Sequence, residues 1–213
     1  MPAEHFRHVR TWVFDLDNTL YHPSVRLFDQ IDVRINAYVQ KVTGADPAES
    51  DRLRHIWWRE HGTTLAGLMA HHGIDPEPYL VDVHDIDFSV LSPDPALRDG
   101  IARLPGRRIV FTNGSAPYAR QVISARGLEG LFDAVYGIEH AGYTPKPQPL
   151  AFDRVFGADR LDPATAAMFE DDPRNLAVPH ALGMRTVLVT PEPEAQPHIH
   201  HHTDDLAGFL SRL

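Results

Sequence analysis

The chain has 213 residues, of which 43% are hydrophobic, and its formal net charge is −9. This acidic balance argues against a nucleic-acid backbone as partner, because proteins that bind one need a surplus of clustered Lys and Arg. The sequence has no cysteine, which excludes disulfides and thiolate metal ligands, so any metal must be held by oxygen or imidazole.

The length allows one ordinary core and a modest second unit, and the hydrophobic content is sufficient to bury an interior. No segment approaches the roughly 20 apolar residues that a helix needs to span a bilayer, so we expect no association with a membrane. Together with the missing cysteines, this predicts a protein of the cytoplasm.

The first predicted strand, 11–14, is a short apolar run that leads directly into two acids. Asp15 and Asp17 follow it, two residues apart. Open α/β sheets bind ligands at the carboxyl ends of their strands, and two carboxylates at such a place need a counter-ion. Taken alone, however, acids after a strand are more often the cap of the next helix.

Residues 21–90 show helical periodicity and no convincing strand. Apolar residues recur at intervals of three and four over 28–42, which places them on one face of a helix. Asp46 and Glu49 resemble a capping box that opens a second helix through Trp57. A third helix is expected over 65–71, with Gly73 as its stop. The pattern predicts a small all-helical unit inserted after the first strand.

From residue 91 onward, short apolar runs alternate with amphipathic helical stretches. The runs at 108–112, 134–137, 166–169 and 186–189 are too short for helices and are expected to be buried strands. Asp94 and Ser115 are the expected N-caps of two intervening helices. The predicted fold class is α/β: a Rossmann-like three-layer sandwich with a parallel sheet, built from 1–20 and 91–213, with 21–90 as a helical cap.

Further polar residues are expected at the ends of the later strands. Thr112 and Asn113 follow the second strand, Lys146 lies in a Pro-Lys-Pro loop, and Asp171 and Asp172 follow the fourth strand. Considered alone, Thr112 is more often the N-cap of a helix, and Lys146 is more often a solvated charge in a loop. Jointly, a carboxylate pair, a hydroxyl, a cation and a second carboxylate pair at one sheet edge predict a site for phosphate chemistry with Mg²⁺.

Hydrolysis of a phosphomonoester explains these residue types, because the bond is inert and the phosphate is anionic. Asp15 would attack phosphorus and form an aspartyl phosphate. Asp17 would first protonate the leaving oxygen and then activate the water. Thr112 and Lys146 would bind and neutralise the transferring oxygens. Asp171 would complete the Mg²⁺ site, with Asp172 next to it.

The segments DLDNTLY, FTNG, PKP and EDD, in this order, resemble the haloacid dehalogenase superfamily, specifically its phosphatases. The resemblance implies that Asp15 is the nucleophile and Asp17 the acid and base. It also implies Mg²⁺ bound by Asp15, by the backbone carbonyl of Asp17 and by Asp171, with phosphate on Thr112 and Lys146. The helical insert resembles the C1-type cap of this superfamily. Asn175 is a departure, since a further acid often stands there.

More narrowly, 62–68, 84–85, 91–104 and 111–114 resemble the pyrimidine 5'-nucleotidase group, which dephosphorylates UMP and CMP. This implies a nucleoside monophosphate as the partner. Tyr21 and Asn113 are expected to contact the substrate, and Trp57 is expected in the core of the insert. The histidine-rich stretch 198–202 is expected to be a solvent-facing loop within 191–202, before a terminal helix capped by Thr203.

Four alternatives remain open at this point. The substrate can be another small phosphorylated metabolite, such as phosphoglycolate or a sugar phosphate, or the enzyme can be a phosphomutase that returns the phosphoryl group. A haloacid dehalogenase expels halide and needs no acid for the leaving group, so Asp17 argues against it. A phospho-acceptor signalling domain also gathers acids, a hydroxyl and a lysine, but its phosphorylated aspartate follows a middle strand.

Overall fold

The computed structural model of the chain describes residues 2–192 and 195–213. A six-stranded parallel sheet with the strand order β3-β2-β1-β4-β5-β6 forms its centre. The strands are β1 (Thr11–Phe14), β2 (Arg107–Phe111), β3 (Ala134–Tyr136), β4 (Ala166–Glu170), β5 (Arg185–Val189) and β6 (His201–Thr203). The predicted α/β class is therefore confirmed, and the five predicted strands match within one residue at each end.

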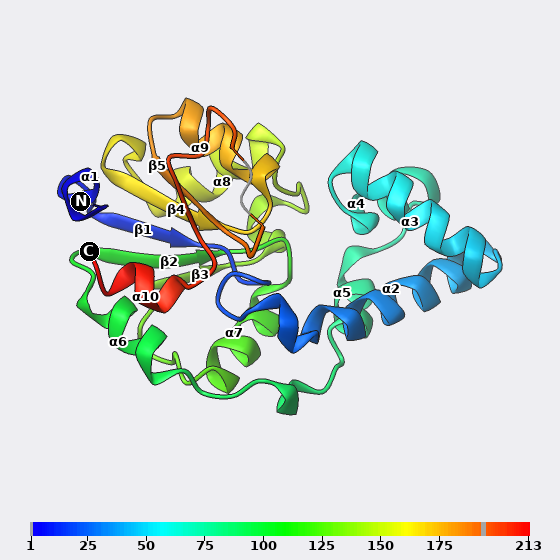
Figure 1. Cartoon of the computed structure of the whole chain (residues 1–213). Coiled ribbons are helices and arrows are strands. Elements are labelled where there is room, and N and C mark those ends of the chain that lie inside the picture. Colours follow the sequence, from blue (N-terminus) through cyan, green and yellow to red (C-terminus); the bar gives the residue numbers. More distant parts are fainter. Residues whose placement is uncertain (1, 193–194) are drawn as a thin grey trace.

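Helices cover both faces of the sheet, which gives three layers (Figure 1). One face carries α6 (Pro95–Arg103), α7 (Ala116–Ala125) and α10 (Leu206–Leu210), and the other carries α8 (Pro149–Asp159) and α9 (Ala177–Ala181). A short α1 (Pro2–Phe6) precedes β1. Among the described residues, none of these or the other helices has the length and apolar character needed to cross a membrane.

Alternation along the strands builds two separate cores, because successive strand side chains point to opposite faces. Phe14 and Phe169 lie in one core, where their rings stack with centroids 4.8 Å apart. Val13 and Met168 lie in the other, and they pair with each other across β1 and β4. Burial of such side chains stabilises the fold by about 1.5–3 kcal/mol each. The strands are apolar on both faces because helices cover both.

The chain order of the strands creates a crevice at the centre of the sheet. From β1 the chain adds β2 and β3 on one side, and it then crosses to place β4, β5 and β6 on the other side. At such a switch point the connections leave β1 and β4 in opposite directions, so the carboxyl ends of these strands are left open for a ligand. Asp15 directly follows β1, and Asp171 directly follows β4.

Four helices and no strand make up the insert between β1 and β2, which stands apart from the sheet (Figure 1). They are α2 (Leu27–Thr43), α3 (Pro47–His61), α4 (Thr64–His72) and α5 (Pro76–Val83). Trp57 is buried as predicted, and it packs so tightly that a Cβ on Gly67 would lie 2.3 Å from its side chain. Only three of these helices were expected. α5 is short, and two prolines in its first turn hide its apolar pattern.

The remaining connections contain short 3₁₀ turns, at η1 (Pro23–Val25), η2 (Phe88–Val90), η3 (Ile138–Ala141), η4 (Pro163–Thr165) and η5 (Pro173–Leu176). Two predicted N-caps of core helices are confirmed. Asp94 accepts from the backbone N–H of Leu97 at the start of α6, and Ser115 accepts from that of Tyr118 at the start of α7.

The C-terminal region differs from the prediction. The stretch expected to be a solvent-facing loop contains β6, which pairs with β5 through Val187 opposite His201. Thr203 ends that strand, and the helix cap is instead Asp205, which accepts from the N–H of Gly208. Histidine-rich sequence carries no strand signal of its own, and this strand forms because an open sheet edge is available. Residues 193 and 194 of the predicted loop lie outside the described part.

Candidate active site

A buried lysine joins two carboxylates where the central strands end. Lys146 Nζ donates to Asp15 Oδ1 at 2.7 Å, to Glu170 Oε2 at 2.6 Å and to the carbonyl oxygen of Phe111 at 2.9 Å. All three residues with charged side chains are at most 5% exposed. Burial lowers the pKa of Lys146, but the attraction of the two carboxylates outweighs it and raises the pKa overall. The ammonium group is therefore charged and uses its three protons.

Asn113 holds this lysine in place. Its side-chain Nδ2 donates to the carbonyl oxygen of Lys146 at 3.0 Å, and its Oδ1 accepts from the N–H of Lys146 at 2.8 Å. Both amide atoms are thus bonded to the lysine backbone, which fixes the loop against the end of β2. Asn113 also lines the cavity beside Asp17, and its predicted role as a substrate contact stays a prediction.

Thr112 lies next to Asn113, directly after β2, and is 1% exposed. Its hydroxyl oxygen accepts from the N–H of Gly114 at 2.9 Å. Gly114 itself is in close contact with the ring of Tyr118, since an added Cβ would lie 2.9 Å from Cδ1. No described residue accepts the hydroxyl proton of Thr112, so this proton is available to a phosphate oxygen at the same sheet edge.

Asp17 is bound by two tyrosines. The hydroxyl of Tyr21 donates to Asp17 Oδ1 at 2.7 Å, and that of Tyr118 donates to the same oxygen at 2.5 Å. Burial raises the pKa of Asp17 above its usual value, although both hydrogen bonds act in the opposite direction. Tyr21 is 2% exposed. The hydroxyl of Tyr21 thus points to the carboxylate of Asp17, and its predicted contact with the substrate stays a prediction.

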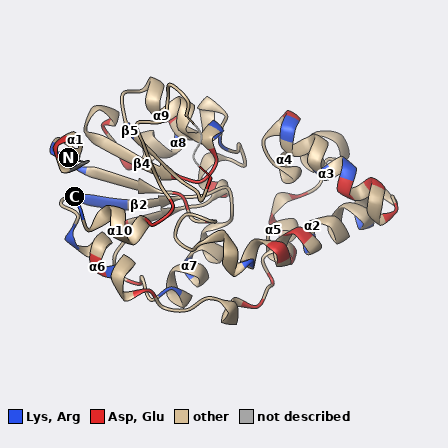
Figure 2. Ribbon diagram, viewed as in Figure 1, with Lys and Arg blue, Asp and Glu red and all other residues tan. Residues whose placement is uncertain are grey.

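Acidic residues gather where the central strands end (Figure 2). Asp15, Glu170 and Asp171 each offer an oxygen within 4.8 Å of the others. Burial, followed by repulsion from Glu170, raises the pKa of Asp15, and the same causes raise the pKa of Asp171 well above its usual value. The single positive charge of Lys146 does not balance the three carboxyl groups of this cluster. Carboxylate oxygens are the ligands that Mg²⁺ prefers, so the residues present fit that ion.

Two of the acids have oxygens to spare for a metal. Asp15 uses only Oδ1 for Lys146, and Asn18 Nδ2 donates to Oδ2 of Asp171 at 3.2 Å. Glu170 is already engaged, since Oε2 accepts from Lys146 and Oε1 from the N–H of Asp172 at 3.2 Å. The geometry therefore favours Asp15 and Asp171 as side-chain ligands.

Asp172, which is predicted next to the metal site, is not one of these three clustered acids. Its carboxylate forms a salt bridge with Arg174 at 2.6 Å and caps the turn η5 by accepting from the N–H of the same residue. Glu170, which sequence reasoning did not assign, takes the third place. It is the last residue of β4, and strand alternation places its side chain on the face opposite to that of Phe169, where it is 1% exposed. The signal in the sequence was an acid at the end of a strand whose two faces are both covered by helices.

A cavity of about 370 Å³ lies between the strand ends and the helical insert. The core contributes Asp17 and Gly114, and the insert contributes the apolar Phe28 together with Arg54 and Trp58. Arg54 donates to Asp32 Oδ1 at 2.5 Å and to Asp51 Oδ1 at 2.8 Å. Asp17 therefore lies on one side of the cavity, and apolar and charged side chains of the insert line the other side.

The end of α3 contacts the two loops that carry the site. The guanidinium of Arg174 lies 3.6 Å from the ring centroid of Trp58, and the side-chain Nε2 of Gln148 donates to the carbonyl oxygen of His61 at 3.1 Å. Arg174 follows the acids after β4, and Gln148 follows the lysine loop. The insert is therefore seated on the core at the site itself.

Comparisons with known proteins concern the family and the fold of the chain. The family model described as hydrolase, haloacid dehalogenase-like hydrolase, matches residues 9–183. Phosphate metabolism protein 8 of Saccharomyces cerevisiae is 25% identical over 199 residues, which cover 84% of this chain and 61% of that protein. The chain thus spans about three fifths of the length of this curated relative.

Two solved structures illustrate the likeness of fold. L-2-haloacid dehalogenase from Xanthobacter autotrophicus, with chloropropionic acid covalently bound, has a TM-score of 0.55 at 21% identity, over 87% of this chain and 79% of that one. The HAD-hydrolase YfnB from Bacillus subtilis, bound to magnesium, has a TM-score of 0.58 at 14% identity, over 96% of this chain and 98% of that one. At these identities the likeness supports the fold alone.

Proposed function

The chain belongs to the haloacid dehalogenase-like hydrolases, and within this family we propose that it is a Mg²⁺-dependent phosphomonoester hydrolase whose nucleophile is Asp15. One observation carries the proposal: a second carboxyl group, Asp17, stands two residues further on, oriented by two hydroxyl groups. A dehalogenase would use the same nucleophile but expels a halide ion, which needs no proton. An alkoxide leaving group does need one.

The reaction proceeds in two displacements. In the first, the carboxylate of Asp15 forms a bond to phosphorus, the bond from phosphorus to the leaving oxygen breaks, and that oxygen takes a proton from Asp17. In the second, Asp17 takes a proton from water, whose oxygen attacks phosphorus and releases inorganic phosphate and free Asp15. The raised pKa of Asp17 favours the protonated form that the first step requires.

Lys146 and Thr112 act on the transferring oxygens. The ammonium group places a fixed positive charge beside Asp15, where negative charge builds up in the transition state. Asp15, the backbone carbonyl of Asp17 and Asp171 would hold Mg²⁺, which when bound supplies further positive charge next to the phosphate. The close group of acids around Asp15 supports this assignment, as does the magnesium bound to YfnB.

The proposed substrate is a pyrimidine nucleoside monophosphate, UMP or CMP. The cavity next to Asp17 has a volume within the range of small-molecule sites, and its apolar and charged walls suit a flat, polar-edged base. Arg54 offers donors and its partner Asp32 offers acceptors. The yeast relative, named for phosphate metabolism, accords with phosphate release. In this proposal residues 21–90 are a cap that closes over the substrate and excludes water.

The first test replaces the nucleophile. In Asp15→Asn we expect no release of phosphate from UMP or CMP, with an unchanged circular dichroism spectrum, because the amide cannot attack phosphorus. Removal of metal by EDTA should abolish turnover in the wild-type protein, and added Mg²⁺ should restore it. The matched control is Asp99→Asn on the exposed surface of α6, which should leave the rate unchanged.

Three results would contradict parts of this proposal. Phosphate release by Asp15→Asn would exclude Asp15 as the nucleophile. Halide release from a 2-haloacid without phosphatase activity would favour a dehalogenase, and an isomeric phosphate ester without free phosphate would favour a mutase. A screen of phosphorylated metabolites, including phosphoglycolate and sugar phosphates, tests the nucleotide specificity, since a better substrate among them would replace UMP and CMP.

A further inference from the structure

We propose that Tyr21 and Tyr118 are positioning residues for Asp17, and that His84 links this positioning to the seat of the helical insert through its stack on Tyr118. The inference rests on the proposed function, because it assumes that Asp17 transfers the proton to the leaving oxygen. It adds two residues, Tyr118 and His84, to which sequence reasoning gave no role in the chemistry.

The two hydroxyls bind one oxygen of Asp17 and leave the other free. Tyr21 and Tyr118 both donate to Oδ1, at 2.7 and 2.5 Å, and no hydrogen bond to Oδ2 joins it to another described residue. An oxygen that accepts two hydrogen bonds is a poor place for the acid proton, so the neutral carboxyl group carries its proton on Oδ2. The tyrosines thereby decide which oxygen is the donor and where it points.

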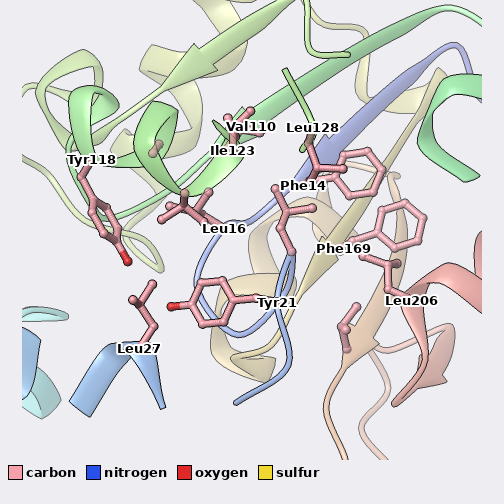
Figure 3. Close-up of a cluster of buried hydrophobic side chains, with 14 of the residues drawn as sticks. Phe14, Leu16, Tyr21, Leu27, Val110, Tyr118, Ile123, Leu128, Phe169 and Leu206 are labelled. Carbon is pink, nitrogen blue, oxygen red and sulfur yellow. The ribbon is translucent and has the colours of Figure 1, made fainter. Parts of the chain in front are cut away.

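The tyrosines act through Asp17 and not on the substrate. They are 2% and 1% exposed, and neither lines the cavity to which Asp17 belongs. Figure 3 shows Tyr21 and Tyr118 among apolar side chains such as Leu16 and Leu27, with their hydroxyl ends directed toward each other. Rings packed in this way have fixed orientations, which is what a support for a catalytic side chain requires.

Each tyrosine is tied to one of the two places where the chain crosses between core and insert. Tyr21 stands on the outgoing crossing, before α2. On the return crossing, after α5, the ring of His84 stacks on that of Tyr118 with centroids 4.2 Å apart and an interplanar angle of 8°. His84 Nδ1 also lies 3.1 Å from the hydroxyl oxygen of Ser115, at the start of α7.

This arrangement couples the position of the insert to the acid. If the insert rotates about its two connections, the backbone before α2 and after α5 must move, and Tyr21 and His84 lie on these segments. Tyr118 belongs to the core, but it loses its stacking partner when His84 moves. The double hydrogen bond to Asp17 therefore persists only while the insert is seated, so proton donation is confined to the closed enzyme.

The experiment compares two kinds of phosphate ester in Tyr118→Phe and Tyr21→Phe. For an ester with a weakly acidic alcohol, such as a nucleoside monophosphate, kcat/KM should fall about tenfold or more in each variant, since acid catalysis contributes roughly 10²–10⁴. For p-nitrophenyl phosphate, whose leaving group departs without a proton, kcat/KM should change less than about threefold, because acid catalysis adds little there. Tyr136→Phe is the matched control, because its hydroxyl binds Asp159 away from the site.

Two further variants test the link through His84. In His84→Ala the rate on the nucleotide should fall as in Tyr118→Phe, and in His84→Phe, which keeps a flat ring against Tyr118, most of it should return. Equal rates for the two His84 variants would overturn the coupling. Equal losses on both esters in both tyrosine variants would mean that the hydroxyls support the fold and not the proton donor.

Asp17→Asn separates this inference from the proposed function. If Asp17→Asn loses the nucleotide reaction but keeps the first displacement of p-nitrophenyl phosphate, measured as a stoichiometric burst of p-nitrophenol before the hydrolysis step, Asp17 is the proton donor, and unchanged rates in both tyrosine variants would then overturn the positioning role. If Asp17→Asn has no effect on either ester, or the wild-type protein releases no phosphate, the proposed function itself fails.

Discussion

Lys146 shows how a single side chain holds the site together. Its ammonium group is 1% exposed and is paired with two carboxylates, at 2.7 and 2.6 Å. Bringing three charges out of water is costly, and their mutual attraction offsets this cost only while all of them are present. Stability and chemistry are therefore both expected to depend on this residue, and the two effects can be measured separately.

The prediction for this residue concerns stability. Lys146→Met should lower the free energy of unfolding by about 3–5 kcal/mol, because Asp15 and Glu170 would remain buried without their partner. Urea unfolding at neutral pH measures it. Lys41→Met, at an exposed position on α2, is the matched control and should change stability by less than about 0.5 kcal/mol.

The double variant Lys146→Met/Glu170→Gln makes the cause testable. Removal of one carboxylate charge should recover part of the lost stability, since less negative charge remains uncompensated. If the second change gives no recovery, the loss comes from packing and not from the unpaired charge.

At the scale of elements, the connections of the insert matter as much as its helices. His84 follows α5 and stacks on Tyr118 of α7, so the return connection is buried against the core. Burial lowers the pKa of His84 to about 4, and this ring is neutral at physiological pH. Because the buried ring of His84 is neutral in the folded state, the stability of the folded state depends on pH.

The prediction for this connection is a loss of stability in acid. Below pH 6.5 the unfolded chain protonates this histidine, whereas the folded chain does so only near pH 4, so its contribution is complete above pH 6.5 and falls as the pH decreases toward 4. Between pH 7 and 5 the decrease is about 2 kcal/mol. Urea unfolding of the wild-type protein and of His84→Phe, compared at both pH values, isolates this histidine from the buried acids.

The acids have the opposite sign, since a raised pKa favours the folded state at low pH. The difference between wild type and variant removes their contribution, because both proteins contain them. An identical pH dependence in the two proteins would show that His84 is as easily protonated in the folded state as in the unfolded state.

Across the whole molecule, the sheet topology brings together residues that are remote in the chain. Asp15 and Lys146 are 131 positions apart, and Lys146 and Glu170 are 24 apart. The crossing after β3 puts β4 beside β1, and this places the acids of both strands at one crevice. A divalent cation bound there would link the two halves of the sheet.

We therefore predict that Mg²⁺ raises the melting temperature. At a concentration 100 times the dissociation constant, binding to the folded state alone adds about 2.7 kcal/mol, which corresponds to roughly 5–10 °C for a chain of this size. Differential scanning calorimetry with and without MgCl₂ measures the shift, with NaCl at equal ionic strength as control. The shift should vanish in Asp171→Asn, and an equal shift in that variant would place the ion elsewhere.

Strands β1 to β5, the α/β class and the positions of Asp15, Thr112 and Asp171 directly after strands were predictable from the sequence, as was the loop position of Lys146. Each depends on local information: the length of an apolar run, its periodicity, and the polar residue that ends it. Parallel strands then bring their ends to one edge without any knowledge of individual contacts.

Tertiary structure alone decided which partner each side chain has. Tyr118 donates to Asp17, which lies 101 positions away, and Glu170 joins Asp15 and Asp171 in the acid cluster. Asn113 binds the backbone of Lys146, and β6 pairs with the open edge of β5. Local periodicity cannot encode such contacts, because they depend on the distance between elements after packing. The sequence thus determines which reactive side chains lie at the edge of the sheet. The residues that hold these side chains in position are determined only when the layers and the helical insert pack together.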